Sequence, residues 1–237
     1  MIRVACPACR SETLDGCPLC RPERWRDIPD LVPPGADPLV MAEMARYDRI
    51  AEGGEYKGHA ATNPEGRARA VKGLLEERGI DAFTELGPGF GELIAATAGM
   101  ERVAVDLSLG MLSRIRELWP DVRCVRGVAH ALPLARTPAL VADGVLQTLP
   151  YIEAFLCEAA RVADLLILSV GFRCNYPRRP QQGFDVRKLD ELEVLVRFLE
   201  ELGFGVELRW FDAAAEEWVA CQADADFLYM VAVKRER

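Results

Sequence analysis

Short apolar runs alternate with stretches of helical periodicity through the middle of the chain. The apolar runs predict strands near residues 82–86, 102–106, 122–125, 139–143 and 165–170. The helices between them are predicted near residues 91–98, 109–118 and 152–162. Strands that alternate with helices in this way form a parallel sheet with helices on both faces, so the predicted fold class is α/β.

Further helical and strand patterns flank this alternation. Helices are predicted at residues 39–52 and 65–78, and Gly79 is the stop signal of the second. Near the C-terminus, "VRKLDELEVLVRFLEELGF" is an amphipathic helix that ends at Gly203, and "GVELRWF" and "DFLYMVAVK" form a closing strand pair. The chain therefore predicts a doubly wound, mostly parallel sheet of seven strands.

The order of these patterns divides the chain into three regions. Residues 1–30 hold a cysteine-rich segment and a linker, and the prolines of "RPERWRDIPDLVPPGADP" indicate that the linker runs over the surface. Residues 31–80 are predicted to be a helical cap or lid, and residues 81–237 the α/β domain.

Composition and charge limit the expected cellular location and partners of the protein. The chain has 237 residues, half of them hydrophobic, and a net charge of -8. No apolar stretch approaches the roughly 20 residues that span a bilayer, and the start "MIRVACPACR" has no hydrophobic signal core. We therefore expect a cytoplasmic protein without a membrane partner. The acidic balance gives no global attraction to phosphate backbones, so nucleic acid is not the default partner.

Four cysteines cluster near the N-terminus with the spacing CxxC-x7-CxxC: Cys6, Cys9, Cys17 and Cys20. Each CxxC turn points two thiolates at one point, so two turns supply a closed tetrahedral set for Zn²⁺. A segment this short buries no core of its own, and metal-binding energies of about 10–16 kcal/mol can replace that burial. Four thiolates leave no open position, so the predicted small zinc ribbon is structural. The alternative, a pair of disulfides, is disfavoured in a reducing cytoplasm.

A glycine-rich turn follows the first strand of the alternation. In "ELGPGFGEL" the glycines are Gly87, Gly89 and Gly91, and Asp106 ends the next strand. Ligands of parallel sheets bind beyond the carboxyl ends of the strands, where a glycine lets a ligand touch the main chain. A carboxylate at Asp106 can accept hydrogen bonds from both ribose hydroxyls. Because the pattern is GxGxG and not GxGxxG, it favours a nucleoside cofactor smaller than a dinucleotide.

These motifs resemble those of the class I S-adenosylmethionine-dependent methyltransferases, whose fold is Rossmann-like. "ELGPGFGEL", "VAVDLSLGML" and "GVAHALPL" are similar, in order and spacing, to the cofactor loop, ribose segment and adenine segment of that family. "ADGVLQTLPYIEAFLCEAARV" is similar to its strand-four region, and "LGFGVELRWF…FLYMVAVKR" to its final hairpin. The resemblance covers about residues 40–235.

The resemblance implies an enzyme that uses S-adenosylmethionine, and it assigns residues to the cofactor. Asp106 would hold the ribose, Leu107 would pack on the adenine ring, and Val128 and Ala129 would flank the adenine. Many relatives carry an acidic residue where Val128 stands, so adenine would depend on main-chain bonds or on His130. The remaining cofactor candidates are Glu85, Gly87, Gly89 and Gly91, around the methionine end, and Asp143.

Candidates for acid–base chemistry are few, because the chain has two histidines. His59 and Tyr56 lie in "EYKGH", before the cofactor loop, in a segment that commonly covers the pocket in the family. They are the catalytic candidates, and a plain surface histidine is the alternative for His59. Where some relatives have a catalytic histidine in "EHL", this chain has "QTL", which makes Gln147 a candidate substrate ligand. The "NPPY" signature of amino-methylating relatives is absent, so exocyclic adenine amines are disfavoured as acceptors.

An arginine-rich loop follows the fifth strand and supplies the other substrate candidates, Arg173, Arg178 and Arg179. Guanidinium groups hold planar carboxylates or phosphates with two parallel hydrogen bonds. The alternative is a solvated loop. If the cluster binds the substrate, the substrate is anionic.

Three functions stay open. We favour a methyltransferase that acts on an O, N or C atom of a small anionic metabolite, with the zinc ribbon as a structural cap or as the contact of a homodimer. The second is an RNA methyltransferase, because a cysteine ribbon before this fold loosely resembles the ribosomal RNA guanine-N1 methyltransferases. Residues 1–26 carry five arginines against three acidic residues, and this small positive excess is thin for an RNA-binding surface. The third is a non-catalytic partner, which the intact glycines and Asp106 argue against.

Overall fold

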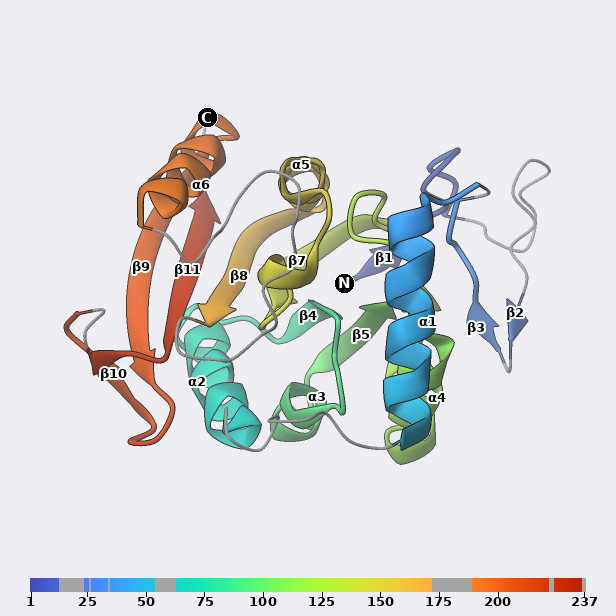
Figure 1. Cartoon of the computed structure of the whole chain (residues 1–237), viewed down its shortest axis with the longest axis horizontal. Helices are drawn as coiled ribbons and strands as arrows, with labels where there is room; N and C mark the ends of the chain where they lie inside the picture. The colour runs from blue at the N-terminus through green and yellow to red at the C-terminus, as the bar shows by residue number, and fades with distance from the viewer. Residues whose placement is uncertain are drawn as a thin grey trace.

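A mixed sheet with helices on both faces forms the centre of the protein (Figure 1). The structure is a computed structural model. It describes residues 1–12, 24–25, 27–33, 35–53, 63–171, 189–221 and 224–235. The strands in these ranges are β1 (Arg3–Val4), β2 (Arg24–Trp25), β3 (Ile28–Pro29), β4 (Ala82–Leu86), β5 (Glu101–Asp106), β6 (Arg123–Arg126), β7 (Leu134–Ala142), β8 (Ala163–Gly171), β9 (Phe204–Asp212), β10 (Glu217–Val219) and β11 (Phe227–Lys234).

The strand order places a ligand crevice at the middle of the sheet. The order is β10-β9-β11-β8-β7-β4-β5-β6, with β1 paired to β7 outside this path and β2 and β3 in a separate hairpin. Strands β8, β7, β4, β5 and β6 are parallel neighbours, and β11 runs antiparallel to both β8 and β9. Successive connections turn in opposite directions from β4 and β7, so the carboxyl ends of these two strands flank the place where such sheets bind ligands.

The helices form two layers, one on each face of the sheet. They are α1 (Pro38–Gly53), α2 (Pro64–Glu77), α3 (Glu92–Ala96), α4 (Leu109–Leu118), α5 (Ile152–Val162), α6 (Leu189–Glu201) and the 3-10 turn η3 (Leu146–Thr148). Helices α2, α3 and α4 bury apolar side chains on one face, and α5 and α6 do so on the other. Within the described ranges, no helix is long and apolar enough to cross a membrane.

Local sequence explains the two helices that the periodicity predicts best. The predicted helices at residues 109–118 and 152–162 coincide with α4 and α5. Ser108 begins α4 because its side chain accepts a hydrogen bond from the Met111 amide at 3.1 Å. In α5, Ile152, Phe155 and Leu156 recur at helical spacing and are buried against the sheet. The predicted strand at residues 82–86 likewise coincides with β4.

Among the described residues the sheet has nine strands, so the prediction of seven is wrong. The two additional strands are β10, which pairs with β9, and β1, in which Arg3 lies opposite Arg136 and Val4 opposite Leu134. Strands of two or three residues are too short to show alternation in a sequence. Pairing with β1 also explains why β7 begins at Leu134, five residues before the strand predicted from residue 139.

The N-terminal residues are part of the main core. Ile2 and Val4 are buried in the same cluster as α5 and α6, and the Ala5 amide donates to the Pro133 carbonyl at 3.1 Å. Ile28 and Leu31 are also buried, and the Leu31 amide donates to the Arg126 carbonyl of β6 at 2.9 Å. Residues 28–31 therefore cover the edge strand β6, and the prediction of a surface linker is wrong for them.

The region predicted as a helical cap contributes in two ways. Helix α2 packs Val71, Leu74 and Leu75 into the core on the sheet, so it belongs to the helical layer. Helix α1 lies beside α4 and carries a single buried apolar residue, Val40 (Figure 1). Only α1 therefore has the position of a cover.

Burial of the N-terminal segment leads to a stability prediction. Ile2 is 2% exposed, so Ile2→Ala should lower the free energy of unfolding by about 2–5 kcal/mol, the range for large-to-small core substitutions. Val194→Ala, at a 40% exposed site on α6, is the control and should change it by less than about 0.5 kcal/mol. Urea denaturation measures both. Equal stability of the two variants would show that the segment is not part of the cooperative core.

Candidate active site

The glycine-rich turn leaves β4 in a conformation that side chains would disturb. Gly87, Gly89 and Gly91 have φ values of 67°, 55° and 90°, in the left-handed region that glycine favours. A Cβ on Gly87 would lie 2.8 Å from Val145 Cγ2, and one on Gly91 would overlap the Trp119 ring. The Gly87 amide donates to the Val105 carbonyl at 2.9 Å, which ties the turn to β5. The predicted bare backbone therefore lies at the carboxyl ends of β4 and β5.

Glu85 is a buried carboxylate without a full set of partners. It lies one residue before the end of β4 and is 4% exposed. Its Oε2 atom is buried and has no hydrogen-bond partner among the described residues. Burial, followed by the nearby charge of Asp143, raises the pKa of Glu85 well above its usual value. A cationic or hydrogen-bond-donating ligand would relieve this cost, as the ammonium of an amino-acid cofactor can.

Asp106 ends β5 beside the glycine turn. It is 8% exposed, and its Oδ1 accepts a hydrogen bond from the Ser108 amide at 2.8 Å. Burial is the main cause that raises the pKa of Asp106 to about 7, against the opposing hydrogen bonds from the Ser108 and Leu107 amides. The structure thus brings together Glu85, the glycine turn and Asp106, as the sequence predicts.

Two aspartates join helix α1 to elements that follow the carboxyl ends of the strands. At its start, Asp37 Oδ2 accepts from the Tyr151 hydroxyl at 2.8 Å, next to α5. Farther along α1, Asp48 Oδ1 accepts hydrogen bonds from two groups at the start of α4. They are the Ser108 hydroxyl, at 2.5 Å, and the Gly110 amide, at 3.1 Å. Because α4 follows β5 and α5 follows β7, α1 reaches across the carboxyl edge that carries Asp106.

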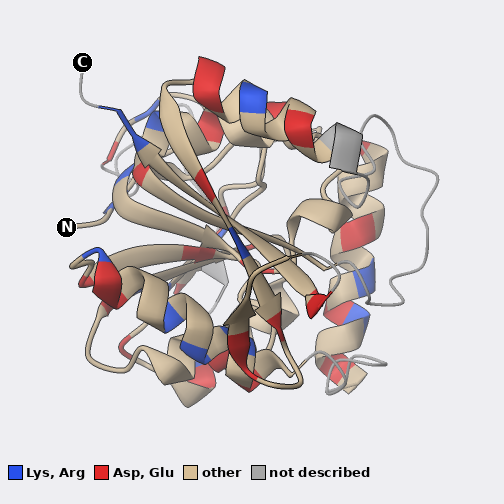
Figure 2. Ribbon diagram, turned by 90° about the vertical axis from the view of Figure 1, so that its left-hand side faces the viewer, with Lys and Arg blue, Asp and Glu red and all other residues tan. Residues whose placement is uncertain are grey.

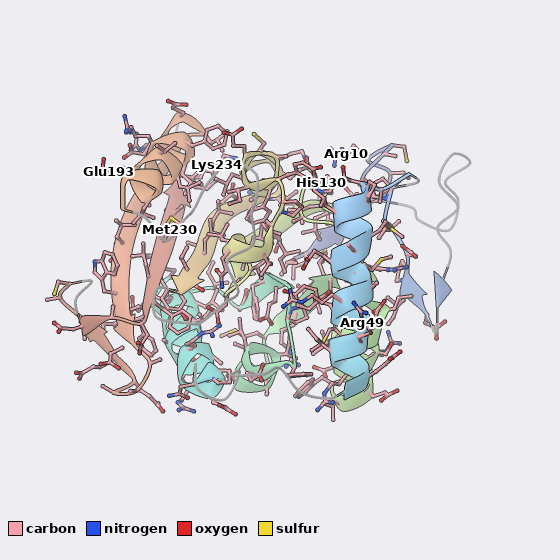
Figure 3. All side chains as sticks on the ribbon, in the orientation of Figure 1. Arg10, Arg49, His130, Glu193, Met230 and Lys234 are labelled. Atoms are coloured by element: carbon pink, nitrogen blue, oxygen red, sulfur yellow. The ribbon has the colours of Figure 1, made fainter. Side chains whose placement is uncertain are left out.

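The predicted adenine-flanking residues form a tight turn after β6. Val128 is buried and pairs with Ala131 in an isolated bridge, and Ala129 and His130 lie between them. The His130 ring contacts the Tyr151 ring edge to face, with 5.3 Å between centroids. Burial lowers the pKa of His130, so the neutral imidazole is favoured. Figure 3 shows His130 toward the start of α1 and Arg49 farther along that helix.

Asp143 directly follows β7, the neighbour of β4 in the sheet. Its Oδ2 accepts from Arg67 Nη2 at 2.5 Å, and its Oδ1 accepts from the Ser169 hydroxyl at 2.5 Å and the Tyr229 hydroxyl at 3.2 Å. Both oxygens are therefore already engaged, and the predicted contact of Asp143 with the cofactor stays a prediction. Sequence reasoning missed Arg67, Ser169 and Tyr229, because a buried arginine on an amphipathic helix has no local signature.

Gln147 lies in η3, directly after β7. Both polar atoms of its side-chain amide are buried and have no hydrogen-bond partner in the described part of the chain. Such an amide is suited to an incoming polar ligand. His59, Tyr56, Arg173, Arg178 and Arg179 lie outside the described residues, so their predicted roles stay predictions.

The first CxxC pair forms a closed turn. The Arg10 amide donates to the Cys6 carbonyl at 2.8 Å, and the Cys6 amide donates to the Ser11 carbonyl at 2.9 Å. Arg10 has φ 61°; Cys6 is buried and Cys9 is partly buried. Cys17 and Cys20 lie outside the described residues, and within the rest no group of three or more potential ligands could hold a metal. The four-thiolate zinc site therefore stays a prediction.

Comparison with known proteins supports the cofactor interpretation. Residues 84–164 match the family model of the methyltransferase domain. No curated protein matches the chain. Among solved structures, the chain is similar to magnesium protoporphyrin IX methyltransferase from Synechocystis PCC 6803 with bound SAM, at 16% identity over 85% of this chain and 99% of that chain, with TM-score 0.59.

Two further structures have the same fold. A TehB-like SAM-dependent methyltransferase from Corynebacterium glutamicum is 18% identical over 83% of this chain and 98% of that one, with TM-score 0.52. A SAM-dependent methyltransferase described as a possible histamine N-methyltransferase, from Thermotoga maritima, is 19% identical over 82% and 96%, with TM-score 0.55. At these identities the structural likeness establishes the fold alone.

The family match and the fold agree with each other. Residues 84–164 match a methyltransferase domain, and the described part of the chain has the fold of the class I S-adenosylmethionine-dependent methyltransferase structures that it resembles. The glycine turn, the buried Glu85 and Asp106 lie within or at the carboxyl ends of its central strands, where that fold binds ligands.

The raised pKa of Asp106 predicts a pH dependence of stability. The folded protein keeps a proton on Asp106 up to a pKa of about 7, whereas the unfolded chain releases it near 3.8, the ordinary pKa of an aspartate. Because the folded state binds more protons in this window, Asp106 makes the free energy of unfolding fall as pH rises from about 4 to 7. Asp106→Asn should abolish this contribution, which amounts to at most about 4 kcal/mol at neutral pH.

Urea denaturation of wild type and variant at several pH values between 4.5 and 7.5 measures the difference. The exposed Asp81→Asn variant is the control, because it leaves the buried carboxylate in place. An unchanged pH slope in Asp106→Asn would contradict the assignment.

Proposed function

We propose that the protein transfers the methyl group of S-adenosylmethionine to an O, N or C nucleophile of a small anionic metabolite. The proposal that the cofactor is S-adenosylmethionine rests on Glu85 and the glycine turn. The Oε2 atom of Glu85 is buried without a hydrogen-bond partner among the described residues, and the adjacent glycine turn leaves the main chain open to a ligand. When bound, the cofactor supplies a methyl group on a sulfonium, which is a good leaving group.

The residues of this chain would bind and align that cofactor. Glu85 accepts hydrogen bonds from the methionine ammonium, and the glycine turn admits the methionine end. Asp106 accepts from the ribose hydroxyls, and Leu107, Val128 and Ala129 enclose the adenine. Holding nucleophile and methyl at about 3–3.5 Å supplies roughly 7–11 kcal/mol of the barrier, so alignment carries most of the catalysis.

We assign the acceptor side as follows. Gln147 donates and accepts hydrogen bonds to the acceptor through its unpartnered amide, and Arg173, Arg178 and Arg179 hold an anionic group. His59, assisted by Tyr56, removes a proton where the nucleophile carries one. The similar structures include a magnesium protoporphyrin IX methyltransferase, which supports a small-molecule acceptor in this fold without identifying it.

The charge distribution favours a metabolite over RNA. The net charge is -8, and Figure 2 shows acidic and basic residues interspersed along the helices. RNA binding depends on clustered cations that displace counterions from phosphates. We further propose that Cys6, Cys9, Cys17 and Cys20 bind one structural Zn²⁺, which metal analysis of the purified protein tests at one equivalent per chain.

A methyl-transfer assay tests the proposed acceptor class. Purified protein with labelled S-adenosylmethionine is incubated in parallel with a small-metabolite extract and with total RNA, each at 50 and 200 mM salt. We expect label in the metabolite fraction, with little salt dependence, because few phosphate contacts are released. Label in RNA that falls by decades between the two salt concentrations would establish the RNA alternative instead.

Glu85→Gln tests the cofactor site itself. The substitution replaces a buried carboxyl group, whose pKa burial raises, by a neutral amide of the same shape, so the ligand-free protein should be at least as stable as wild type. It also removes a charge-assisted hydrogen bond worth about 1.5–3 kcal/mol, so affinity for S-adenosylhomocysteine should fall about tenfold to hundredfold. Thermal unfolding and calorimetry measure the two effects, with exposed Glu76→Gln as control. Unchanged affinity in Glu85→Gln would exclude the proposed cofactor contact.

A further inference from the structure

The connection between β6 and β7 has an unusual construction. It consists of residues 127–133, here called the crossover, and contains no helix. Strands β6 and β7 are separated in the sheet by β5 and β4. Seven residues make a short connection, because a parallel crossover with a helix takes a dozen or more. Strand β7 begins at Leu134 but pairs with β4 only from Ala139, so the first residues of β7 carry the chain across the sheet.

The crossover begins with the turn that would flank the adenine. The Ala131 amide donates to the Val128 carbonyl at 3.2 Å, and the Gly127 amide donates to the Asp106 carbonyl at 2.9 Å. A Cβ on Gly127 would lie 2.7 Å from Pro133 Cγ, so the two ends of the crossover touch. The position of Val128 and Ala129 thus depends on how Leu132 and Pro133 are held.

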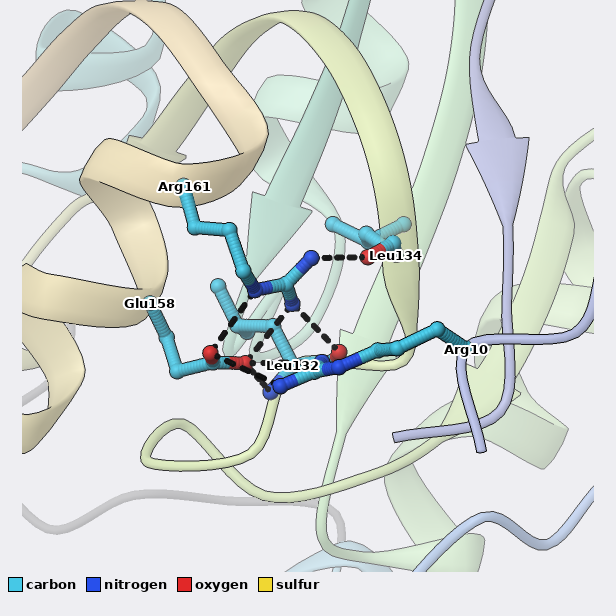
Figure 4. Close-up of polar contacts among 5 residues, drawn as sticks. All are labelled: Arg10, Leu132, Leu134, Glu158 and Arg161. Carbon is cyan, nitrogen blue, oxygen red and sulfur yellow. Dashed lines mark hydrogen bonds and ion pairs between the residues drawn. The ribbon is translucent and has the colours of Figure 1, made fainter. Parts of the chain in front are cut away.

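Glu158 of α5 holds the far end of the crossover (Figure 4). Its Oε2 accepts a hydrogen bond from the Leu132 amide at 2.9 Å, and its two oxygens also accept from Arg161 at 2.7 and 2.8 Å. Arg161 in turn donates to the carbonyls of Leu132 and Leu134. A carboxylate that is 14% exposed thereby fixes the main chain four residues after Val128.

The N-terminal segment supplies the remaining partner of this carboxylate. Arg10 Nη2 lies 3.2 Å from Glu158 Oε1, and Arg10 Nη1 lies 3.4 Å from Oε2. Arg10 closes the cysteine turn, residues 6–11, with its amide on the Cys6 carbonyl. The same segment contacts the crossover directly, since the Ala5 amide donates to the Pro133 carbonyl. Figure 3 also shows Arg10 and His130 toward the same end of α1.

We propose that the cysteine turn braces the crossover through Arg10 and Glu158, and that this brace positions the adenine side of the cofactor site. Arg10 and Glu158 are positioning residues, because they act through the main chain of the crossover. The inference rests on the proposed function insofar as it places the adenine beside Val128 and Ala129. It adds a role for the N-terminal segment that does not require contact with the acceptor.

Two Arg10 variants separate the guanidinium from the turn. Arg10→Met removes the charged group and keeps an apolar stem. Arg10→Gly removes the side chain in a backbone conformation that glycine favours, since φ is 61°, so it preserves the turn. The control is Arg69→Met, which breaks an ion pair with Glu216 on an exposed surface of α2.

Two measurements are made on each variant and on wild type: the affinity for S-adenosylhomocysteine by calorimetry, and hydrogen exchange of the amides of residues 128–132. Both Arg10 variants should weaken the affinity about threefold to tenfold and speed exchange in the crossover by a similar factor. Arg69→Met should change neither. Wild-type affinity and exchange in both Arg10 variants would overturn the inference.

A double-mutant cycle tests the link to the cysteine turn. Cys9→Ser should reproduce the loss seen in Arg10→Met, and Cys9→Ser combined with Arg10→Met should be no weaker than either alone, because both remove the same brace. Additive losses would show that the cysteine turn acts independently of Arg10 and would overturn the link. If wild type fails to bind S-adenosylhomocysteine, the proposed function fails, and the exchange rates of the crossover still decide whether the brace exists.

Discussion

The seven-residue return from β6 to β7 constrains the rest of this structure. A connection without a helix leaves this part of the sheet without the cover that a crossover helix usually gives. Residues of the N-terminal segment fill this position: β1 pairs with the start of β7, and Ile2 and Val4 enter the core. Residues on the N-terminal side of the boundary expected near residue 30 therefore pack within the main core.

The same return path brings the main chain of β5, β6 and the crossover together at the carboxyl edge. Asp106 both ends β5 and accepts the Gly127 amide through its carbonyl, so the ribose and adenine candidates share one piece of backbone. Helix α1 lies beside α4 and is held by two aspartates, Asp37 just before its start and Asp48 within it.

Sequence predicted the elements that have a strong local signal and missed those created by distant partners. The glycine turn, Asp106 and helices α4 and α5 follow from spacing, apolar periodicity and capping at Ser108. Strand β1 was missed because its partner is more than 130 residues away and its length is two residues. Arg67 was missed because its significance comes from Asp143, which meets it only in the fold. Burial of a charge is decided by packing and not by local pattern.

The electrostatics of the crevice limit the choice of acceptor. Glu85, Asp106 and Asp143 lie at the carboxyl ends of adjacent strands, and Arg67 is held by Asp143. Burial raises the pKa of both Glu85 and Asp106, and a cationic group that binds beside Glu85 favours its ionised form. A negative group about 8 Å from that ionised carboxylate is repelled by roughly 2 kcal/mol at an effective dielectric constant of 20. The bound cation offsets part of this repulsion, and an anionic acceptor needs further cations of its own. The proposal of an anionic metabolite therefore depends on the cations Arg173, Arg178 and Arg179. Without cations beside the acceptor, the negative field would favour a neutral or cationic acceptor molecule.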